Sequence, residues 1–216
     1  MAKPTSNFLI VLSQSQDFFR EHAKIRKSKK VEITETKLSG VKLLKPKRFG
    51  DHRGFFAETY SQRAYTGLGL DATFVQDNHS LSVAQGTVRG LHFQAPPCAQ
   101  AKLVRCGRGA IFDVAVDIRR GSPTYGRWAG FTLSAENGAQ LYIPVGFAHG
   151  FATLEPDSEI IYKCSDYYAP KTEGALCWDD PDIGITWPLS APPVLSEKDA
   201  AAPLLAGFNS PFTFEG

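Results

Sequence analysis

The stretch AIFDVAVDI, residues 110–118, decides the fold of this chain. Apolar residues occupy its even positions from Phe112 to Ile118, whereas Asp113 and Asp117 occupy odd positions. Because successive side chains of a strand point to opposite faces, this alternation puts the apolar set on one face and the carboxylates on the other. A period of two is typical of a strand with one buried face, so we expect a half-buried strand here.

Further short apolar segments lie on both sides of this strand, separated by glycine and proline. They are rich in β-branched and aromatic residues, which favour strands. The expected strands are VKLLK (41–45), FFAETYS (55–61), TFVQDNHS (73–80), TVRGLHF (87–93), KLVRC (102–106), GFTLS (130–134), QLYIP (140–144) and SEIIYKCS (158–165). Many short strands without helix–strand alternation predict an all-β sandwich or jelly roll. Short helices are expected only near the chain ends, notably in SEKDAAAPLL (196–205), with Ser196 as the cap and Pro203 at the end.

The composition is that of an ordinary globular protein. With 216 residues, of which 43% are hydrophobic and 21% charged, the chain suffices for a single all-β domain. A net charge of +2 is too small to indicate nucleic-acid binding. No apolar run approaches the length of a membrane span, and NFLIVL (7–12) is too short for an export signal. Four cysteines without a C-x-x-C pair predict reduced thiols, and we expect a cytoplasmic protein.

Residues 1–36 differ in character from the rest of the chain. The segment SQDFFREHAKIRKSKK (15–30) has weak helical character and ends in a basic run. Such a segment is typical of a solvated tail or of a short helix docked on the body, and a basic patch that recruits a partner is the alternative. We therefore divide the chain into an N-terminal extension, 1–36, and a single jelly-roll domain, 37–216.

Polar residues occupy strand positions where they bury no apolar surface. The segment 73–80, which we expect to be a central strand, carries polar side chains on both faces, and Tyr162 shares a face with Ile160 and Cys164. The polar-lined mouth of a jelly roll is a usual place for a ligand. The other side chains that would line such a cavity are Arg53, Glu58, Arg89, His92, Lys102 and His149.

Arg89 and His92 pose a problem of direction, because strict alternation puts them on opposite faces of one strand. Gly90 lies between them, and glycine inside a strand often marks a bulge that re-aims a side chain. We therefore predict a bulge at Gly90 that allows both residues to reach one cavity.

Taken singly, each of these residues has a structural explanation. A strand histidine such as His92 is more often a hydrogen-bonded structural residue than a catalyst. Tyr162 would be an amphipathic core residue, and Lys102 a long side chain that carries its charge to the surface. Asp199 would be an acid in the first turn of a helix, where the helix dipole favours it.

Taken together, they fall in segments whose order is that of a known family. The segments are KRFGDHRGFFAETYSQRAY (47–65), FVQDNHS (74–80), TVRGLHFQ (87–94), AKLVRC (101–106), IFDVAVDIRRGSPTYGRWAGFTLSAEN (111–137), LYIPVGFAHGFATL (141–154), EIIYKCSDYYAPKTEGALCWDDPDIGITWP (159–188) and LSEKDAAAPLL (195–205). This set resembles the dTDP-4-dehydrorhamnose 3,5-epimerase family, cupin-type jelly-roll enzymes of nucleotide-sugar metabolism. The resemblance covers about residues 41–205, and the departures are the N-terminal extension and the APPC loop (95–98).

The resemblance implies a role for each residue of the predicted cavity. His92 matches the family's catalytic base, and Asp199 matches the residue that orients it. Lys102 matches the lysine beside the reacting carbonyl, and Tyr162 the candidate acid. Tyr167 would line the sugar pocket. The contacts with the nucleotide sugar would come from Arg53, Glu58, Gln76, Asp77, Asn78, Arg89, His149, Glu173 and Lys198.

The implied reaction is the epimerisation at C3 and C5 of dTDP-4-dehydro-6-deoxy-D-glucose to dTDP-4-dehydro-L-rhamnose, in dTDP-rhamnose and polysaccharide biosynthesis. The C4 ketone acidifies both carbon-bound protons, so a base is needed on one side of the ring and an acid on the other. This scheme needs no cofactor. We expect no metal, because His92 and His149 are the only plausible ligand pair and show no H-x-H spacing. The resemblance also implies a homodimer, in which the segment 34–44 adds to the sheet of the partner.

Other functions stay open at this point. One is an enzyme that epimerises only C3 or only C5, or a 3,4-ketoisomerase, acting on a related dTDP-4-keto sugar. Another is a carbohydrate-binding jelly roll without activity, and a third is a metal-dependent cupin oxygenase or isomerase. The complete set of base, acid and lysine makes the inactive binding module the weakest of these alternatives, and the resemblance leads us to expect the double epimerase.

Overall fold

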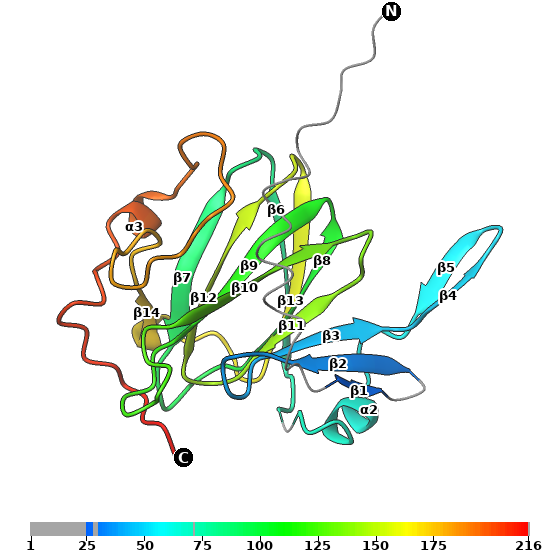
Figure 1. Ribbon diagram of the computed structural model, residues 1–216, viewed down its shortest axis with the longest axis horizontal. Helices are drawn as coiled ribbons and strands as arrows, with labels where there is room; N and C mark the ends of the chain where they lie inside the picture. The colour runs from blue at the N-terminus through cyan, green and yellow to red at the C-terminus, as the bar shows by residue number, and fades with distance from the viewer. Residues whose placement is uncertain (1–24, 28–29, 71, 216) are drawn as a thin grey trace, which may run out of the picture.

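Two sheets packed face to face form the body of the protein (Figure 1). The structure is a computed structural model and describes residues 25–27, 30–70 and 72–215. Within these residues the larger sheet has seven strands, in the order β1 (Ile25–Lys27), β2 (Val31–Glu35), β3 (Lys42–Pro46), β11 (Gln140–Ile143), β8 (Lys102–Arg108), β13 (Ser158–Cys164) and β6 (Gln76–Ser82). The smaller sheet has five, in the order β10 (Trp128–Ser134), β9 (Ala110–Asp117), β12 (Phe147–Thr153), β7 (Val88–Gln94) and β14 (Glu173–Ala175).

The remaining elements lie outside these two sheets. The strands β4 (Arg48–Asp51) and β5 (Gly54–Ala57) pair as a hairpin that projects away from the body in Figure 1. The described helices are short, namely α2 (Gln62–Thr66), a 3-10 turn at Pro170–Thr172, and α3 (Glu197–Ala200).

Consecutive strands cross repeatedly between the two sheets, which is the connectivity of a jelly roll. The chain runs from β8 in the larger sheet to β9 and β10 in the smaller one, returns to the larger sheet at β11, and crosses again at β12 and β13. The ladders between these strands are antiparallel. The predicted cupin-type jelly roll is thus confirmed.

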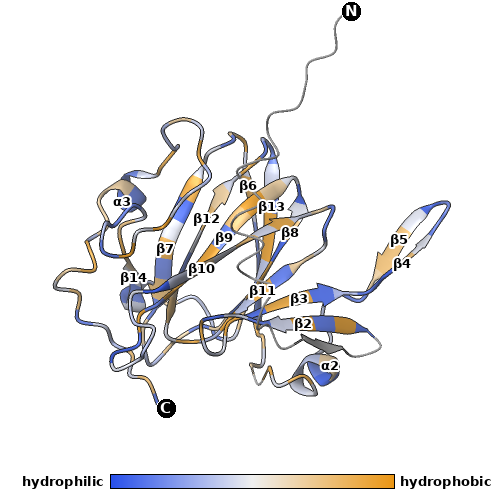
Figure 2. Ribbon diagram, in the orientation of Figure 1, coloured by the Kyte–Doolittle hydropathy of each residue, from blue (hydrophilic) through white to orange (hydrophobic). Residues whose placement is uncertain are grey.

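Apolar side chains from both sheets fill the space between them, and Figure 2 shows how hydrophobic residues concentrate on the strands. Val104 and Ile160 of the larger sheet are fully buried there, as is Ile111 of the smaller sheet. Burial of apolar surface on this scale is the main stabilising contribution to a fold of this kind. The core fills one part of the interior, and polar side chains line the rest.

The expectation of a half-buried strand at residues 110–118 was wrong, because both faces of β9 are covered. Ile111 and Ala115 face the core between the sheets, while Val114 and Val116 pack against Ile183 and other residues of the C-terminal segment. The alternation within β9 cannot show that a distant segment folds over its second face.

Asp117 on β9 is fully buried and satisfied by its own loop. It accepts hydrogen bonds from the Arg119 guanidinium at 2.7 Å, from Ser122 at 2.6 Å and from Thr124 at 2.7 Å. Burial acts to raise the pKa of Asp117, but these hydrogen bonds stabilise the carboxylate and lower its pKa overall. A buried charge is tolerated here because every partner lies within the same turn.

The segment 73–80 was expected to be a central strand, but β6 lies at the edge of the larger sheet. One face of this edge strand is open to solvent, where Asp77 and His79 are exposed. The opposite face carries Asn78 and Ser80, which are partly buried. Polar residues on both faces therefore reflect an edge position together with a polar interior, and not a central strand.

Several boundaries differ from the sequence-based expectation. The strand β12 was not expected, and only the first part of FFAETYS lies in a strand, because β5 ends at Ala57. Within the predicted N-terminal extension, Ile25–Lys27 and Val31–Glu35 are strands, and β2 pairs with β3 of the same chain. This part is neither helix nor tail, and residues 1–24 lie outside the described residues.

The predicted C-terminal helix is confirmed as α3, which is shorter than expected and ends at Ala200. Its cap is Ser196, whose side-chain oxygen accepts the backbone N–H of Asp199 at 3.1 Å. Among the described residues, no helix is both long and apolar enough to cross a membrane.

Candidate active site

A cavity of about 460 Å³ opens between the two sheets on the side of α3. Its lining combines polar and charged side chains from both sheets with apolar ones from the segment before α3. The lining residues are Ser80, Thr87, Val88, Arg89, His92, Lys102, His149, Phe151, Tyr162, Val194, Leu195, Ser196, Lys198 and Asp199. The structure therefore brings all four predicted catalytic residues to one space.

His92 and Asp199 form a close pair on the side of the smaller sheet. The Nε2–H of His92, on β7, donates to Oδ1 of Asp199, on α3, across 2.5 Å. The Asp199 side chain is only 5% exposed, whereas His92 is 29% exposed. Because the carboxylate holds the proton on Nε2, the other ring nitrogen keeps a free lone pair and is the available base.

The pKa of His92 lies below its ordinary value of 6.5. Burial is the main cause, and the positive charges of Lys102 and Lys198 lower it further, while the Asp199 carboxylate acts in the opposite direction. The imidazole is therefore neutral at neutral pH, which is the form that can accept a proton.

A bulge at Gly90 aims Arg89 into the same cavity as His92, as predicted. The register between β7 and β12 shifts opposite this glycine, and both side chains line the cavity. Gly90 has a φ of +127°, and a Cβ placed on it would lie 2.5 Å from Cα of Gly150. Only glycine fits this close approach of two backbones.

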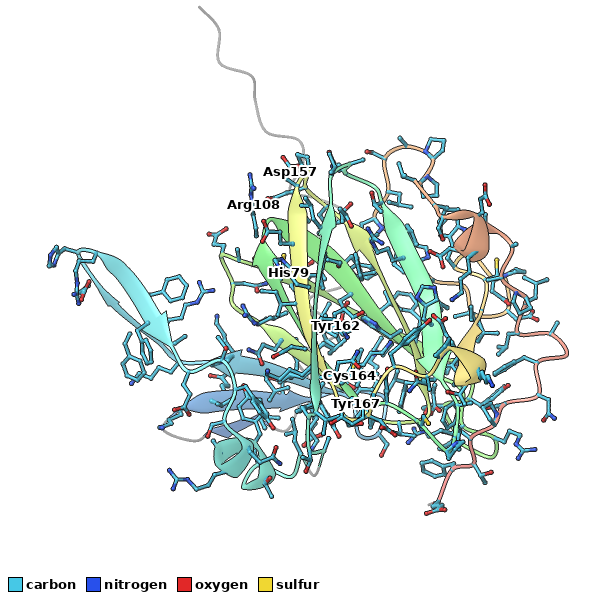
Figure 3. The ribbon with its side chains drawn as sticks, turned by 180° about the vertical axis from the view of Figure 1, so that it is seen from behind. His79, Arg108, Asp157, Tyr162, Cys164 and Tyr167 are labelled. Atoms are coloured by element: carbon cyan, nitrogen blue, oxygen red, sulfur yellow. The ribbon has the colours of Figure 1, made fainter. Side chains whose placement is uncertain are left out.

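Lys102 and Tyr162 come from the larger sheet and face the His92–Asp199 pair across the cavity. Lys102 begins β8 beside Cys164 of β13, and Tyr162 lies two residues earlier on β13, which Figure 3 shows near the middle of the sheet. Burial raises the pKa of the Tyr162 phenol above its ordinary value of 10. The phenol is therefore protonated at neutral pH and can donate a proton.

Burial also lowers the pKa of the Lys102 ammonium from its ordinary value of 10.5. The negative charges of Asp113 and Glu173, together with Cys164, oppose this shift. A buried ammonium whose charge is only partly balanced by nearby negative groups is suited to stabilise negative charge that develops on a substrate oxygen.

His149 lies next to His92 in the ladder of β12 and β7, and it forms a second histidine–carboxylate pair. Its Nε2 is 2.8 Å from Oδ1 of Asp113, and both residues are buried. Oδ2 of Asp113 has no hydrogen-bond partner within the described part of the chain. His149 is thus held firmly at the wall of the cavity.

The rim beside α3 carries an ion pair between Lys198 and Glu173. Nζ of Lys198 lies 2.7 Å from Oε2 of Glu173, which also accepts the hydroxyl of Tyr168 at 3.1 Å. Burial acts to raise the pKa of Glu173, but these hydrogen bonds lower it overall. Lys198 lines the cavity, so Glu173 contacts a lining residue without lining the cavity itself.

Seven of the predicted substrate contacts, Glu173 among them, do not line the cavity of this chain. Arg53 lies in the turn of the β4–β5 hairpin, paired with Asp51 at 2.5 Å, and Glu58 follows β5 and pairs with Lys30 at 3.1 Å. Tyr167 is 66% exposed in the loop after β13, at the lower end of the sheet in Figure 3. The other three are Gln76, Asp77 and Asn78.

These three residues of β6 divide between two faces. Gln76 and Asn78 share the face of Ser80, which lines the cavity, and Asn78 donates to Sγ of Cys164. Asp77 points to the outer face, where it forms a 2.7 Å ion pair with Lys163 beside a small hollow of about 90 Å³. The structure thus brings two of the three towards the cavity and one away from it.

Some lining residues were not predicted. Phe151, Val194 and Leu195 give the cavity an apolar side, and Ser80 adds a hydroxyl. The alternation of β6 already put Ser80 on the face of Asn78, but Val194 and Leu195 precede a short helix whose docking place no local pattern reveals. Within the described residues, no group of three or more His, Cys, Asp or Glu side chains could hold a metal ion.

Comparison with known proteins gives the same family at the level of sequence. The family model described as dTDP-4-dehydrorhamnose 3,5-epimerase matches residues 35–207. The dTDP-4-dehydrorhamnose 3,5-epimerase of Salmonella typhimurium is 56% identical over 174 residues, which are 80% of this chain and 94% of that protein.

Solved structures agree. The 3,5-epimerase of Legionella pneumophila, in complex with dTDP-4-keto-L-rhamnose, superposes with a TM-score of 0.83 at 45% identity, over 86% of this chain and all of that one. A 3'-monoepimerase of Streptomyces bikiniensis in complex with dTDP-quinovose superposes with a TM-score of 0.75 at 38% identity, over 79% of this chain and 86% of that one.

Proposed function

Since the chain belongs to the dTDP-4-dehydrorhamnose 3,5-epimerase family, we propose that it converts dTDP-4-dehydro-6-deoxy-D-glucose to dTDP-4-dehydro-L-rhamnose. The observation that carries this proposal is the arrangement of one cavity. A neutral histidine held by a carboxylate enters it from the smaller sheet, and a lysine and a protonated tyrosine enter it from the larger sheet. Epimerisation next to a ketone needs these groups on opposing sides of one sugar ring.

His92 removes the carbon-bound proton next to the C4 ketone. Its neutral ring accepts the proton, and the imidazolium that forms is stabilised by the Asp199 carboxylate at 2.5 Å. Because Asp199 also fixes the tautomer, the base is ready before the substrate binds. A positioned base of this kind contributes roughly 10² to 10⁴ in rate.

Removal of the proton leaves an enolate with its negative charge on the C4 oxygen. Lys102 supplies the positive charge that stabilises this oxygen. The loss of one such preorganised donor typically costs about 10² to 10³ in rate.

Tyr162 returns a proton to the opposite face of the ring, which inverts the configuration. Its raised pKa keeps the phenol protonated until the enolate forms. The same residues serve C3 and C5, because both carbons flank the same ketone. Before the step repeats at the second carbon, His92 must release its proton to solvent and Tyr162 must regain one, and the sugar ring must shift or turn within the cavity.

The dTDP part of the substrate carries negative charge, which the cations at the cavity can bind. Arg89 lines the cavity and is held by Ser82 and the carbonyl of Leu81, and Lys198 lies at the rim. Arginine binds phosphate through a planar fork of donors, which suits a diphosphate. Glu173, His149, Gln76 and Asn78 complete the set that lies on or beside the cavity wall.

The position of Arg53 and Glu58 supports a homodimer. Both lie on or next to the projecting β4–β5 hairpin, whose Phe55 and Phe56 are 59% and 70% exposed. Exposed aromatic residues on a projecting hairpin favour contact with another chain. We infer that a second copy of this chain receives the hairpin, so that Arg53 and Glu58 serve the site of the partner, and light scattering of the purified protein tests the dimer.

The four cysteines of the chain are unpaired, which fits a reducing compartment and supports the inferred cytoplasmic location.

An epimerase that acts at C3 alone is the second candidate, because a 3'-monoepimerase also superposes on this chain. The higher sequence identity to 3,5-epimerases favours action at both carbons. Incubation with dTDP-4-dehydro-6-deoxy-D-glucose in heavy water, followed by NMR, separates the two. Deuterium at both C3 and C5 is the expected result; deuterium at C3 alone identifies a monoepimerase, and no exchange contradicts the epimerase.

A further inference from the structure

Gln94 is a buried glutamine that the proposed mechanism does not use. It is the last residue of β7, on the same face as His92 two residues earlier, and it is only 4% exposed. It does not line the cavity. A buried amide needs several partners, because it carries two donor hydrogens and one acceptor oxygen.

The Gln94 amide finds these partners in two loops. Its Nε2 donates to the carbonyl of Tyr167 at 2.9 Å and to the carbonyl of Cys98 in a shorter bond. Its Oε1 accepts the backbone N–H of Ala169 at 2.9 Å. One side chain therefore holds both sides of the turn at 167–169 and ties it to the APPC loop (95–98).

The 167–169 turn is linked to a lining residue of the cavity, Lys198, through Tyr168 and Glu173. It carries the side chains of Tyr167 and Tyr168, which are 66% and 57% exposed. The hydroxyl of Tyr168 donates to Glu173, the partner of Lys198 at the cavity wall. In the ladder of β14 and β7, Glu173 lies directly opposite Gln94. The residue that holds the backbone of the turn and the residue that accepts the Tyr168 hydroxyl are therefore neighbours in one sheet.

We propose that Gln94 is a positioning residue that fixes the 167–169 turn against β7, the strand that carries His92, and so sets the affinity for the nucleotide part of the substrate. This inference rests on the proposed function. The interior of the cavity holds the reacting sugar next to His92, Lys102 and Tyr162, so the nucleotide extends past the rim. Free movement of the turn would weaken binding there without moving the reacting groups.

The residue type itself supports a positioning role. An apolar side chain of the same length would bury equally well but would leave the carbonyl of Tyr167 and the N–H of Ala169 without partners. A glutamate would accept from Ala169 but would face two carbonyl oxygens with a carboxylate. Among the common side chains of this length, only glutamine matches one acceptor and two donors to the groups present.

The test compares the full-length protein with Gln94→Ala and Gln94→Glu. For both variants we expect KM for dTDP-4-dehydro-6-deoxy-D-glucose and the Kd of thymidine diphosphate to rise about tenfold, equivalent to about 1.4 kcal/mol, with kcat within about threefold of wild type. Gln94→Glu keeps the size and the Ala169 contact, so it decides the outcome if Gln94→Ala does not fold.

Asn137→Ala is the matched control. The Asn137 amide also makes three backbone hydrogen bonds, to Thr132, Ser134 and Ala139, but in the turn between β10 and β11, away from the cavity. This variant is expected to lose thermal stability and to keep the wild-type KM and Kd. A stability loss alone therefore cannot account for a change in KM in the Gln94 variants.

Hydrogen–deuterium exchange gives a readout independent of activity. Peptides that contain residues 166–170 should exchange at least about tenfold faster in Gln94→Ala, which loses the acceptor of the Ala169 N–H, while β13 stays protected. Unchanged exchange together with a KM and a Kd within twofold of wild type would overturn the inference. If the wild type shows no turnover of the 4-keto sugar, the proposed function fails, and exchange and thymidine diphosphate binding still decide the role of Gln94.

Discussion

Replacement of Asp199 by asparagine is the most direct test of how the cavity makes a base. The Asp199 side chain is almost completely buried, and its carboxylate accepts the Nε2–H of His92 at 2.5 Å. Asparagine has the same shape, but its amide can present an N–H to the ring, which favours the tautomer with the proton on the other nitrogen. The proton would then occupy the position that must accept one from the substrate.

Two effects contribute to the expected loss. The wrong tautomer removes the base, and the corresponding change in a Ser-His-Asp triad lowers kcat about 10⁴-fold. The second effect is on the pKa of His92, which burial lowers and Asp199 raises. Without the carboxylate this pKa falls further below 6.5, so the remaining neutral imidazole is also a weaker base. We expect kcat to fall roughly 10³- to 10⁴-fold.

The assay is kcat/KM for the 4-keto sugar nucleotide measured across about pH 5 to 9, with wash-in of deuterium as the readout. For the wild type, the acid limb should lie below pH 6.5, because only neutral His92 is active and its pKa is lowered. In Asp199→Asn the plateau should fall and the acid limb should move to lower pH. Thermal melting shows whether the fold survives, and the Ser196 cap is retained because it uses only the backbone N–H of Asp199.

Glu197→Gln is the control, since Glu197 lies in the same short helix but is exposed. It removes one negative charge from α3 without a contact to His92 and should leave the pH profile unchanged. Retention of more than a tenth of kcat by Asp199→Asn, or an acid limb displaced to higher pH, would show that Asp199 does not orient the base.

Three further predictions follow from the same cavity. Lys102→Met should lower kcat about 10²- to 10³-fold and move the acid limb of kcat/KM to higher pH, because Lys102 lowers the pKa of His92. NMR titration of His92 measures the same shift, and an acid limb that does not move would contradict the prediction. Tyr162→Phe should still allow deuterium exchange at the substrate but little inversion, as measured by the ratio of epimer to exchanged starting sugar; normal inversion would remove Tyr162 as the acid. The pKa of His92 in the folded protein is lowered from 6.5, so the unfolded chain binds more protons than the folded one as the pH falls below 6.5, and the free energy of unfolding decreases there. Denaturant unfolding of His92→Gln should show a smaller decrease over the same pH range than wild type, and equal decreases would contradict the lowered pKa.

The sequence predicted those parts of the site that depend on one strand and its immediate neighbours. Gly90 indicated the bulge that sends Arg89 and His92 to one cavity, and Ser196 indicated the helix that carries Asp199. Local pattern was insufficient wherever the cover of a strand comes from far away in the chain. The second face of β9 is buried by C-terminal residues such as Ile183, some 65 to 75 positions later, and nothing in the alternation of β9 reports this contact.

The place of Arg53 shows a different limit. Its residue type and its motif predicted a substrate contact, but the direction of a projecting hairpin depends on what it packs against. Within the described residues, β4 and β5 pair only with each other and project away from the two large sheets. The sequence of the hairpin therefore indicates what the turn can bind, whereas the assembly determines whose substrate it binds.

The charges of the cavity depend on one another, which explains why the catalytic set is arranged across two sheets. Burial and the Lys102 and Lys198 ammonium groups keep His92 neutral, and burial keeps Tyr162 protonated. Lys102 thus has two effects, since the charge that stabilises the enolate oxygen also prevents premature protonation of the base. Asp199 opposes it and limits how weak the base becomes. A lysine on the same strand as His92 would lower the pKa of the base equally well but could not reach across the sugar, so the enolate would lose its cation. The facing sheets of the jelly roll therefore allow one electrostatic arrangement to set the protonation state of the base and to stabilise the product of its action.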